Sequence, residues 1–223
     1  RLNFTEIGNI PPAEFVEVAE NRGLIEKLGN LVFEKVCRFI SENRDLVPAV
    51  SVNFSVYQMV NPNIVETVNS IMKKYDVSPQ NIIMEITESI FIDDFNIVLE
   101  NMKKLSDLGI KFYLDDFGTG YSNLANVVML PFSAIKIDRS LVLMTEDDKK
   151  GERFFSNILS TFKDSNLNIL VEGVETSTQN QIVEQAGADY IQGFLYSRAI
   201  PEKDCVELFK NQKKSKNVNA DAN

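Results

Sequence analysis

The chain contains no histidine and only two cysteines among its 223 residues. Without histidine it cannot use an imidazole base, a Ser-His-Asp triad or a histidine-ligated zinc ion. The remaining polar chemistry rests on carboxylate, amide and lysine side chains, and the oxygen ligands among them suit Mg²⁺ or Mn²⁺. Cys37 and Cys205 each fall on an apolar helical stripe. We therefore expect buried, reduced thiols rather than a disulfide or a catalytic nucleophile.

Basic residues are also fewer than acidic ones. The chain has 23 lysines and arginines against 32 acidic residues, which gives a net charge of −9. This balance argues against non-specific binding of long nucleic acids through a basic surface. An anionic substrate would need cations to mediate its binding.

Long apolar runs and a signal peptide are absent too. We therefore expect a cytoplasmic protein, or the cytoplasmic part of a membrane-anchored one. The chain starts at Arg1 without an initiator methionine, so we expect it to be a fragment of a longer protein.

The apolar pattern predicts short strands that alternate with amphipathic helices after an irregular start over residues 1–9. Residues 145–151 read as a charged loop. The alternation is typical of a parallel α/β protein, and each strand carries polar residues at its C-terminal end, as in a TIM-like (β/α)₈ barrel. A doubly wound sheet would gather such residues at one switch point. The six predicted strands are at residues 49–55, 82–87, 111–114, 134–138, 168–171 and 190–193.

A closed barrel needs eight strands and roughly 250 residues, so we expect the first two strands to lie upstream of residue 1. The predicted barrel domain covers residues 1–210. Residues 211–223 are rich in lysine and asparagine and lack apolar periodicity, which predicts a disordered polar tail.

The strand at 111–114 is followed by Asp115 and Asp116 and then by a glycine-punctuated turn at 118–120. Neighbouring strand residues point to opposite faces, but both carboxylates can turn toward one metal site if the backbone bends where the strand ends. The alternative is a helix N-cap in an ordinary strand-to-helix turn. Glu85 lies inside another apolar strand, where its charge is costly unless a partner or a metal compensates it.

Six motifs follow one another along the chain: Val-Asn-Phe-Ser at Asn53, Glu-Ile-Thr-Glu at Glu85, Asp-Asp-Phe-Gly-Thr-Gly-Tyr-Ser at Asp115, Lys-Ile-Asp at Lys136, Glu-Gly-Val-Glu-Thr at Glu172 and Gln-Gly at Gln192. In this order they resemble the EAL domain family, and the resemblance covers residues 1–210. It implies a cyclic di-GMP phosphodiesterase that forms linear pGpG with two divalent cations, Mg²⁺ or Mn²⁺, or else an inactive receptor for the same dinucleotide. The Glu-Ala-Leu motif that names the family is absent, and its place is just before Arg1, which we interpret as truncation.

The resemblance also implies a ligand set. One cation would be held by the missing glutamate with Asn53, Glu85 and Asp115, and the second by Asp115, Asp116 and Glu172. Two such cations clamp phosphate oxygens and lower the pKa of a water between them. The resemblance assigns Lys136 to orienting that water or stabilising the transition state. Glu172 is also a candidate general base.

The same resemblance assigns supporting roles. Arg1 would contact substrate phosphate, and Gln192 would hydrogen-bond a water at the metal. Glu88 would anchor the loop of Phe117, Gly118, Thr119, Gly120, Tyr121 and Ser122, which would couple metal occupancy to a homodimer interface. Asp138 and Glu175 would either support the ligands or act as surface and capping residues. Fused GGDEF or sensory domains are possible in the parent protein.

Three functions fit these observations to different degrees. An active phosphodiesterase is favoured over a receptor because every ligand within the chain is intact. An enolase-type barrel with Mg²⁺ and a lysine base would explain Lys136 and the carboxylates. It would not explain the order of all six motifs.

Overall fold

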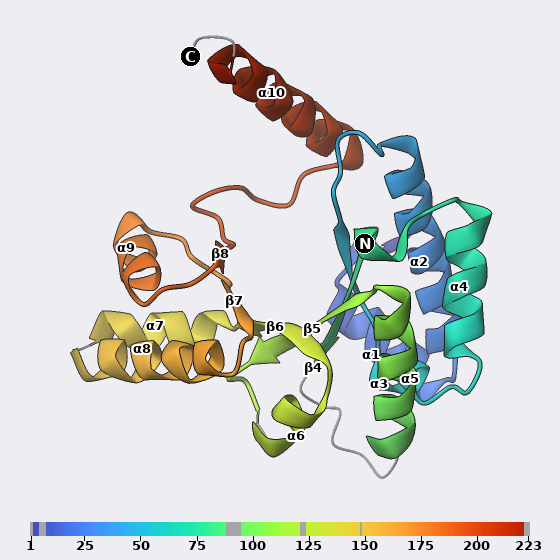
Figure 1. Cartoon of the computed structure of the whole chain (residues 1–223), viewed down its shortest axis with the longest axis horizontal. Helices are drawn as coiled ribbons and strands as arrows, with labels where there is room; N and C mark the ends of the chain where they lie inside the picture. Colours follow the sequence, from blue (N-terminus) through green and yellow to red (C-terminus); the bar gives the residue numbers. More distant parts are fainter. Residues whose placement is uncertain (1, 5–7, 88–94, 121–123, 148, 221–223) are drawn as a thin grey trace.

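The computed structural model of the chain describes residues 2–4, 8–87, 95–120, 124–147 and 149–220. Its centre is a sheet of six parallel strands whose order in space follows their order in the sequence. The sheet curls as part of a barrel, with β3 at one edge and β8 at the other (Figure 1). This arrangement confirms the predicted α/β class and the six predicted strands. They are β3 (Val50–Asn53), β4 (Ile82–Thr87), β5 (Lys111–Phe117), β6 (Phe132–Ile137), β7 (Asn168–Val171) and β8 (Tyr190–Ile191).

Helices alternate with the strands and cover the convex side of the curled sheet in two groups. Figure 1 shows α2, α4 and α5 beside one half of the sheet and α7 and α8 beside the other. The helices are α1 (Pro12–Asn21), α2 (Ile25–Glu42), α3 (Val56–Met59), α4 (Ile64–Lys74), α5 (Phe95–Leu108), α6 (Leu124–Met129), α7 (Arg139–Asp147), α8 (Lys149–Asp164), α9 (Ser177–Gln185) and α10 (Glu202–Ala220), with a 3₁₀ turn at Pro79–Asn81.

The apolar core forms two clusters that match these two groups of helices. The first joins α2 to α5 with β3, β4 and β5 around Phe33, Met84 and Phe112. The second joins β6 and β7 with α7, α8 and α9 around Ile135 and Leu159. Each cluster buries the inward faces of amphipathic helices against strands, which is the main stabilising term of such a fold.

Two local signals that were readable in the sequence act as expected. Gly109 ends α5 with a φ of 107°, a conformation that costs glycine little. Thr176 starts α9 with a capping box, in which the Gln179 amide donates a 3.2 Å hydrogen bond to Thr176 Oγ1.

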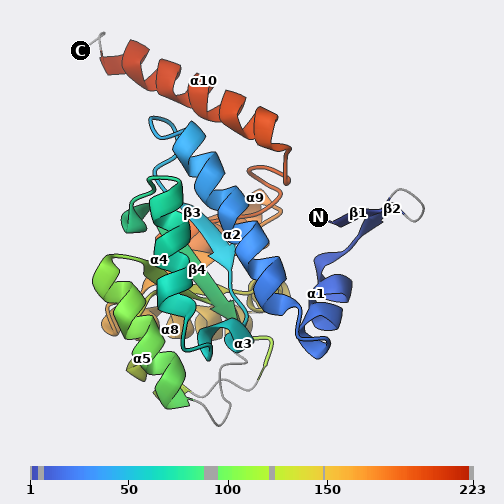
Figure 2. The same ribbon diagram turned by 90° about the vertical axis from the view of Figure 1, so that its right-hand side faces the viewer.

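Two predictions about irregular segments are wrong. The described residues before α1 include an antiparallel pair of strands, β1 (Leu2–Phe4) and β2 (Gly8–Ile10), which projects from α1 in Figure 2. Its three-residue strands are too short to show a periodic pattern. The charged segment 145–151 was predicted as a loop, but its described residues belong to α7 and α8. Lysine and glutamate are good helix formers, so a run of charges does not exclude a helix.

The C-terminal helix α10 runs through residues 211–220, where we expected irregular chain. It lies apart from the sheet in both views, and Lys213 Nζ donates a 3.1 Å hydrogen bond to the carbonyl of Asp45. The division of the chain at residue 210 stays a prediction. Both cysteines are free, as expected, but only Cys37 is fully buried, whereas Cys205 on α10 is half-buried.

Within the described residues, none of the helices is both long enough and apolar enough to cross a membrane.

Candidate metal centre

The bend predicted at Asp115 and Asp116 is present, but it lies inside a strand. β5 continues to Phe117, three residues beyond the predicted end. Its pairing with β6 shifts register between Leu114 and Phe117, and Asp116 has a φ of 55°. Such an irregularity lets consecutive side chains leave the alternation of a regular strand. Both carboxylates can therefore serve one site.

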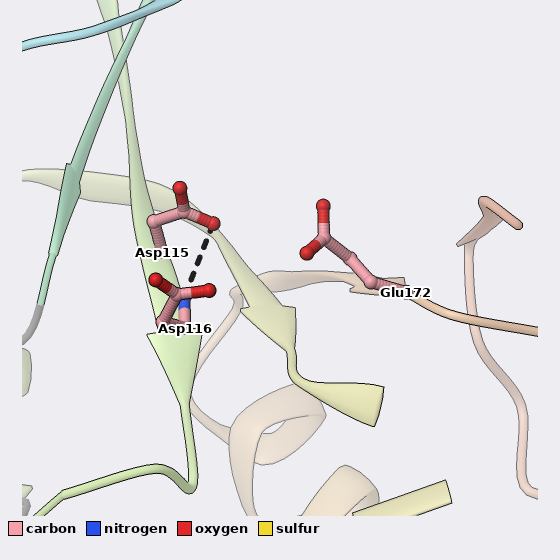
Figure 3. Close-up of side chains that lie close together, drawn as sticks. All are labelled: Asp115, Asp116 and Glu172. Atoms are coloured by element: carbon pink, nitrogen blue, oxygen red, sulfur yellow. Dashed lines mark hydrogen bonds between the residues drawn. The ribbon is translucent and has the colours of Figure 1, made fainter. Parts of the chain in front are cut away.

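Glu172 brings a third carboxylate to this pair. It follows β7 directly, and its amide donates a 2.9 Å hydrogen bond to the carbonyl of Ile137 at the end of β6. Asp115, Asp116 and Glu172 each offer one oxygen within 4.8 Å of the others. Figure 3 shows their side chains converging from β5 and the end of β7. The structure thus brings together the three carboxylates that the resemblance assigned to the second cation.

Lys136 lies at the centre of the acidic side chains. Its Nζ atom is 2.7 Å from Asp115 Oδ1, 2.8 Å from Glu172 Oε1 and 3.0 Å from Glu85 Oε2. The lysine side chain is only 6% exposed. Charges buried to this degree are tolerated when they are paired and hydrogen-bonded. Lys136 is thus the partner that the buried Glu85 was expected to need.

The pKa values show how crowded the carboxylates are. Burial raises the pKa of Glu172, and the charges of Asp115 and Glu85 add to this against the opposing effect of Lys136. Burial likewise raises the pKa of Asp116, followed by the nearby charges of Asp115 and Asp138. Both shifts mean that the folded protein resists holding all of these negative charges at once.

The pKa of Lys136 shifts in the direction opposite to the usual effect of burial. Burial alone would lower the pKa of its ammonium group, but hydrogen bonds to Asp115 and Glu172 raise the pKa above the ordinary lysine value. The three carboxylates around this single cation leave two negative charges uncompensated, and Asp116 adds another. A concentrated set of oxygen donors with surplus negative charge fits a hard divalent cation.

Asn53 lies outside this acidic cluster but faces the same space. It is the last residue of β3, is exposed, and pairs in register with Glu85. A cavity of about 840 Å³ is lined by Asn53 and Asp116, together with side chains of α1 and α2 such as Phe15 and Val32. The candidate ligands Asn53 and Asp116 therefore line the same cavity as apolar side chains of α1 and α2.

Asp138 and Glu175 have identifiable structural roles. Asp138 Oδ1 accepts a 2.8 Å hydrogen bond from the amide of Ser140 at the start of α7. Glu175 forms two hydrogen bonds with Arg139, of 2.7 and 2.9 Å. Reading the sequence missed Arg139, because 36 residues separate it from Glu175 and no local signal joins them.

The remaining predicted residues are more scattered. Gln192 is exposed directly after β8, and its amide donates a 2.8 Å hydrogen bond to the carbonyl of Val171. Phe117 belongs to β5 and packs edge-on against Phe162. Thr119 donates hydrogen bonds from its amide and its hydroxyl to the carbonyl of Asp116, between Gly118 and Gly120. Arg1, Glu88, Tyr121 and Ser122 lie outside the described residues.

Comparisons with known proteins show which family the chain resembles over most of its length. The EAL domain profile matches residues 1–199. The bifunctional diguanylate cyclase/cyclic di-GMP phosphodiesterase MucR of Pseudomonas aeruginosa is 34% identical over 209 residues, which cover 92% of this chain and 30% of MucR. The cyclic di-GMP phosphodiesterase PdeR of Escherichia coli is 32% identical over 203 residues, which cover 90% of this chain and 31% of PdeR.

A solved structure of the MucR phosphodiesterase in complex with c-di-GMP has a TM-score of 0.84 to this chain at 32% identity. The similarity covers 92% of this chain and 84% of that chain. The chain spans about a quarter to a third of the length of several curated relatives that it matches.

Proposed function

Because the chain belongs to the EAL domain family, whose solved members share its TIM-like barrel fold, we propose that it hydrolyses cyclic di-GMP to linear pGpG with two divalent cations, Mg²⁺ or Mn²⁺. The observation that carries this proposal is the set of carboxylates of Glu85, Asp115 and Glu172 around Lys136, with Asp116 beside them.

The donor atoms support two cations. Asn53, Glu85 and Asp115 would hold one, with Asp115, Asp116 and Glu172 holding the other. When bound, such cations polarise the phosphate and lower the pKa of the attacking water. All of these side chains offer oxygen, which is the ligand type that Mg²⁺ and Mn²⁺ prefer.

Lys136 supplies a fixed positive charge. Its carboxylate partners keep the Nζ protons in place, because they raise the pKa of the ammonium group despite its burial. A preorganised, buried ammonium stabilises the negative charge that develops on the phosphate oxygens in the transition state. We therefore assign Lys136 to transition-state stabilisation rather than to proton abstraction.

The cavity beside the carboxylates offers room for the dinucleotide. Its volume of about 840 Å³ falls within the range of small-molecule sites. Its apolar lining from α1 and α2 suits a base, and Asn53 and Asp116 at its wall bring the ligand close to the candidate metal oxygens. Since the protein and the substrate are both anionic, the cations also make binding electrostatically favourable.

The test is to incubate the protein with cyclic di-GMP and Mn²⁺ and to separate the products by ion-pair chromatography. We expect pGpG to appear with Mn²⁺ or Mg²⁺ and to be absent after treatment with EDTA. A Lys74→Ala variant should turn over the substrate like the wild type, because Lys74 forms an exposed ion pair with Glu34 away from the site. It is the control for variants that replace a lysine within the site. Tight binding of cyclic di-GMP with no turnover in any metal would replace the enzyme with a receptor.

Partners beyond the substrate stay predictions. We propose a homodimer and further domains in a longer natural form of the protein. The short span of the chain relative to MucR supports the second proposal. Light scattering on the purified protein would test the first, since a monomer at all accessible concentrations would contradict it. A cytoplasmic location also stays a prediction.

A further inference from the structure

The segment that carries Glu172 is linked through side chains to one neighbouring helix. Residues 172–176 connect β7 to α9, and two side-chain links tie this segment to α7. Helix α7 begins at Arg139, directly after the strand that contains Lys136. The attachment to α7 therefore adds to the hydrogen bond from the Glu172 amide to Ile137 in setting the position of Glu172 relative to Lys136.

The first link is the ion pair of Arg139 with Glu175. Both guanidinium Nη atoms donate to the carboxylate, at 2.7 and 2.9 Å. An ion pair this exposed adds little to global stability, but a two-point contact fixes the relative orientation of its partners. Gly173 has a φ of 71°, and a Cβ atom added to it would lie 2.5 Å from Cβ of Arg139. The segment thus passes directly against the stem of the arginine.

The second link runs through Gln179, which is only 3% exposed. Its Oε1 atom accepts hydrogen bonds from the amides of Glu175 and Thr176, at 2.7 and 3.0 Å. Its Nε2 atom donates a 2.7 Å hydrogen bond to Glu146 Oε1 on α7. Of the two polar side-chain atoms of Gln179, the capping box of α9 uses only Oε1. The bond from Nε2 to Glu146 goes beyond helix capping and connects the segment to α7.

We propose that Arg139 and Gln179 are positioning residues that fix Glu172 against Lys136 through helix α7. This inference rests on the proposed function, because it concerns the same carboxylate site. Residues that orient metal ligands from behind typically affect metal affinity or activity by about 10- to 100-fold. A side chain that only stabilised the fold would change neither quantity selectively.

The first test uses Gln179→Glu. The new carboxylate keeps an acceptor for the amides of Glu175 and Thr176, but it cannot donate to Glu146 and repels it. We expect binding of Mn²⁺, followed by electron paramagnetic resonance of the free ion, to weaken by about 10-fold or more, with a similar loss of kcat and little change in KM. Adding Glu146→Gln in the same chain restores the hydrogen bond with its direction reversed, because the new amide at position 146 can donate to the new carboxylate at position 179. This double variant should recover Mn²⁺ binding.

The second test uses Arg139→Ala, which should weaken Mn²⁺ binding in the same way. Arg139→Lys keeps the charge but loses the two-point contact, so its effect should be intermediate. Arg38→Ala is the matched control, since Arg38 pairs with Glu42 on the surface of α2, and it should bind Mn²⁺ like the wild type. Thermal unfolding of each variant shows whether a loss is selective for the site.

Wild-type Mn²⁺ affinity in both Gln179→Glu and Arg139→Ala would overturn the inference. So would failure of the double variant to recover binding, or a loss of binding matched by general unfolding. These readouts do not need turnover. A wild-type protein that binds Mn²⁺ but leaves cyclic di-GMP intact would refute the phosphodiesterase and leave the positioning roles standing.

Discussion

Lys136 Nζ lies 2.7 Å from Oδ1 of Asp115 on the neighbouring strand, and both side chains are buried. This contact places the one ammonium of the site beside the aspartate that we assign to both cations. Removing Lys136 leaves the buried Asp115 without its cationic partner, and in comparable pairs such a loss costs several kcal/mol. Removing Asp115 still leaves Lys136 paired with Glu85 and Glu172. The two residues nevertheless differ in their proposed work, and that difference can be measured.

Lys136→Ala should lower kcat by about 10²- to 10³-fold, because it removes a fixed charge from the transition state. Binding of cyclic di-GMP, measured by calorimetry with non-catalytic Ca²⁺, should change much less. Lys74→Ala serves as the control for removal of a lysine. A Lys136→Ala variant whose kcat matched that of the wild type would contradict the assignment.

Glu85→Ala and Asp115→Ala should each abolish turnover, because each removes a cation ligand. Mn²⁺ titration should show fewer bound ions per chain than in the wild type. Glu66→Ala on α4 is a suitable control, since that glutamate lies on a helix on the outer side of the sheet. Hydrolysis near the wild-type rate in both site variants would defeat the assignment of two cations.

Thr176→Ala should lower the free energy of unfolding by about 1 kcal/mol, because it removes the side-chain cap of α9. Urea denaturation followed by circular dichroism measures this change. Thr161→Ala is the matched control: the Thr161 hydroxyl bonds within α8, where alanine is the better helix former. The control should be neutral or slightly stabilising, and an equal loss in both variants would argue against a capping effect.

The two cysteines should differ sharply toward thiol reagents. Burial, with a smaller effect of Glu34, raises the pKa of the Cys37 thiol to about 12, whereas Cys205 is half-buried on α10. The thiolate is the reactive form, so at pH 8 we expect one thiol per native chain to react with Ellman's reagent and the second only after unfolding. Cys205→Ser should remove the fast reaction. Rapid labelling of Cys37 in that variant would show that the first core cluster opens readily.

The strands and their functional side chains were readable from the sequence because each short apolar run ends beside a polar residue. The convergence of Glu85, Asp115, Lys136 and Glu172 follows from that pattern once the strands lie in parallel order. The pairing of Arg139 with Glu175 was not readable, because it depends on how two helices and two loops pack.

The helical structure within residues 145–151 and the strand pair of Leu2–Phe4 with Gly8–Ile10 were missed for local reasons. A charged helix shows weak apolar periodicity, and strands of three residues show almost none. The length of β5 was underestimated because two consecutive aspartates are unfavourable in a strand. Here the shifted register and the positive φ of Asp116 accommodate them.

The strict sequential order of the sheet has a consequence for biogenesis. Every strand from β4 to β8 pairs with the strand that precedes it in the chain, so within the described six-stranded sheet no pairing waits for a distant segment made much later. During synthesis, each strand and helix can dock on the part already folded as it leaves the ribosome. The carboxylates would then assemble in turn, from Glu85 to Glu172, and the last of them would arrive only after α7 is in place to receive it.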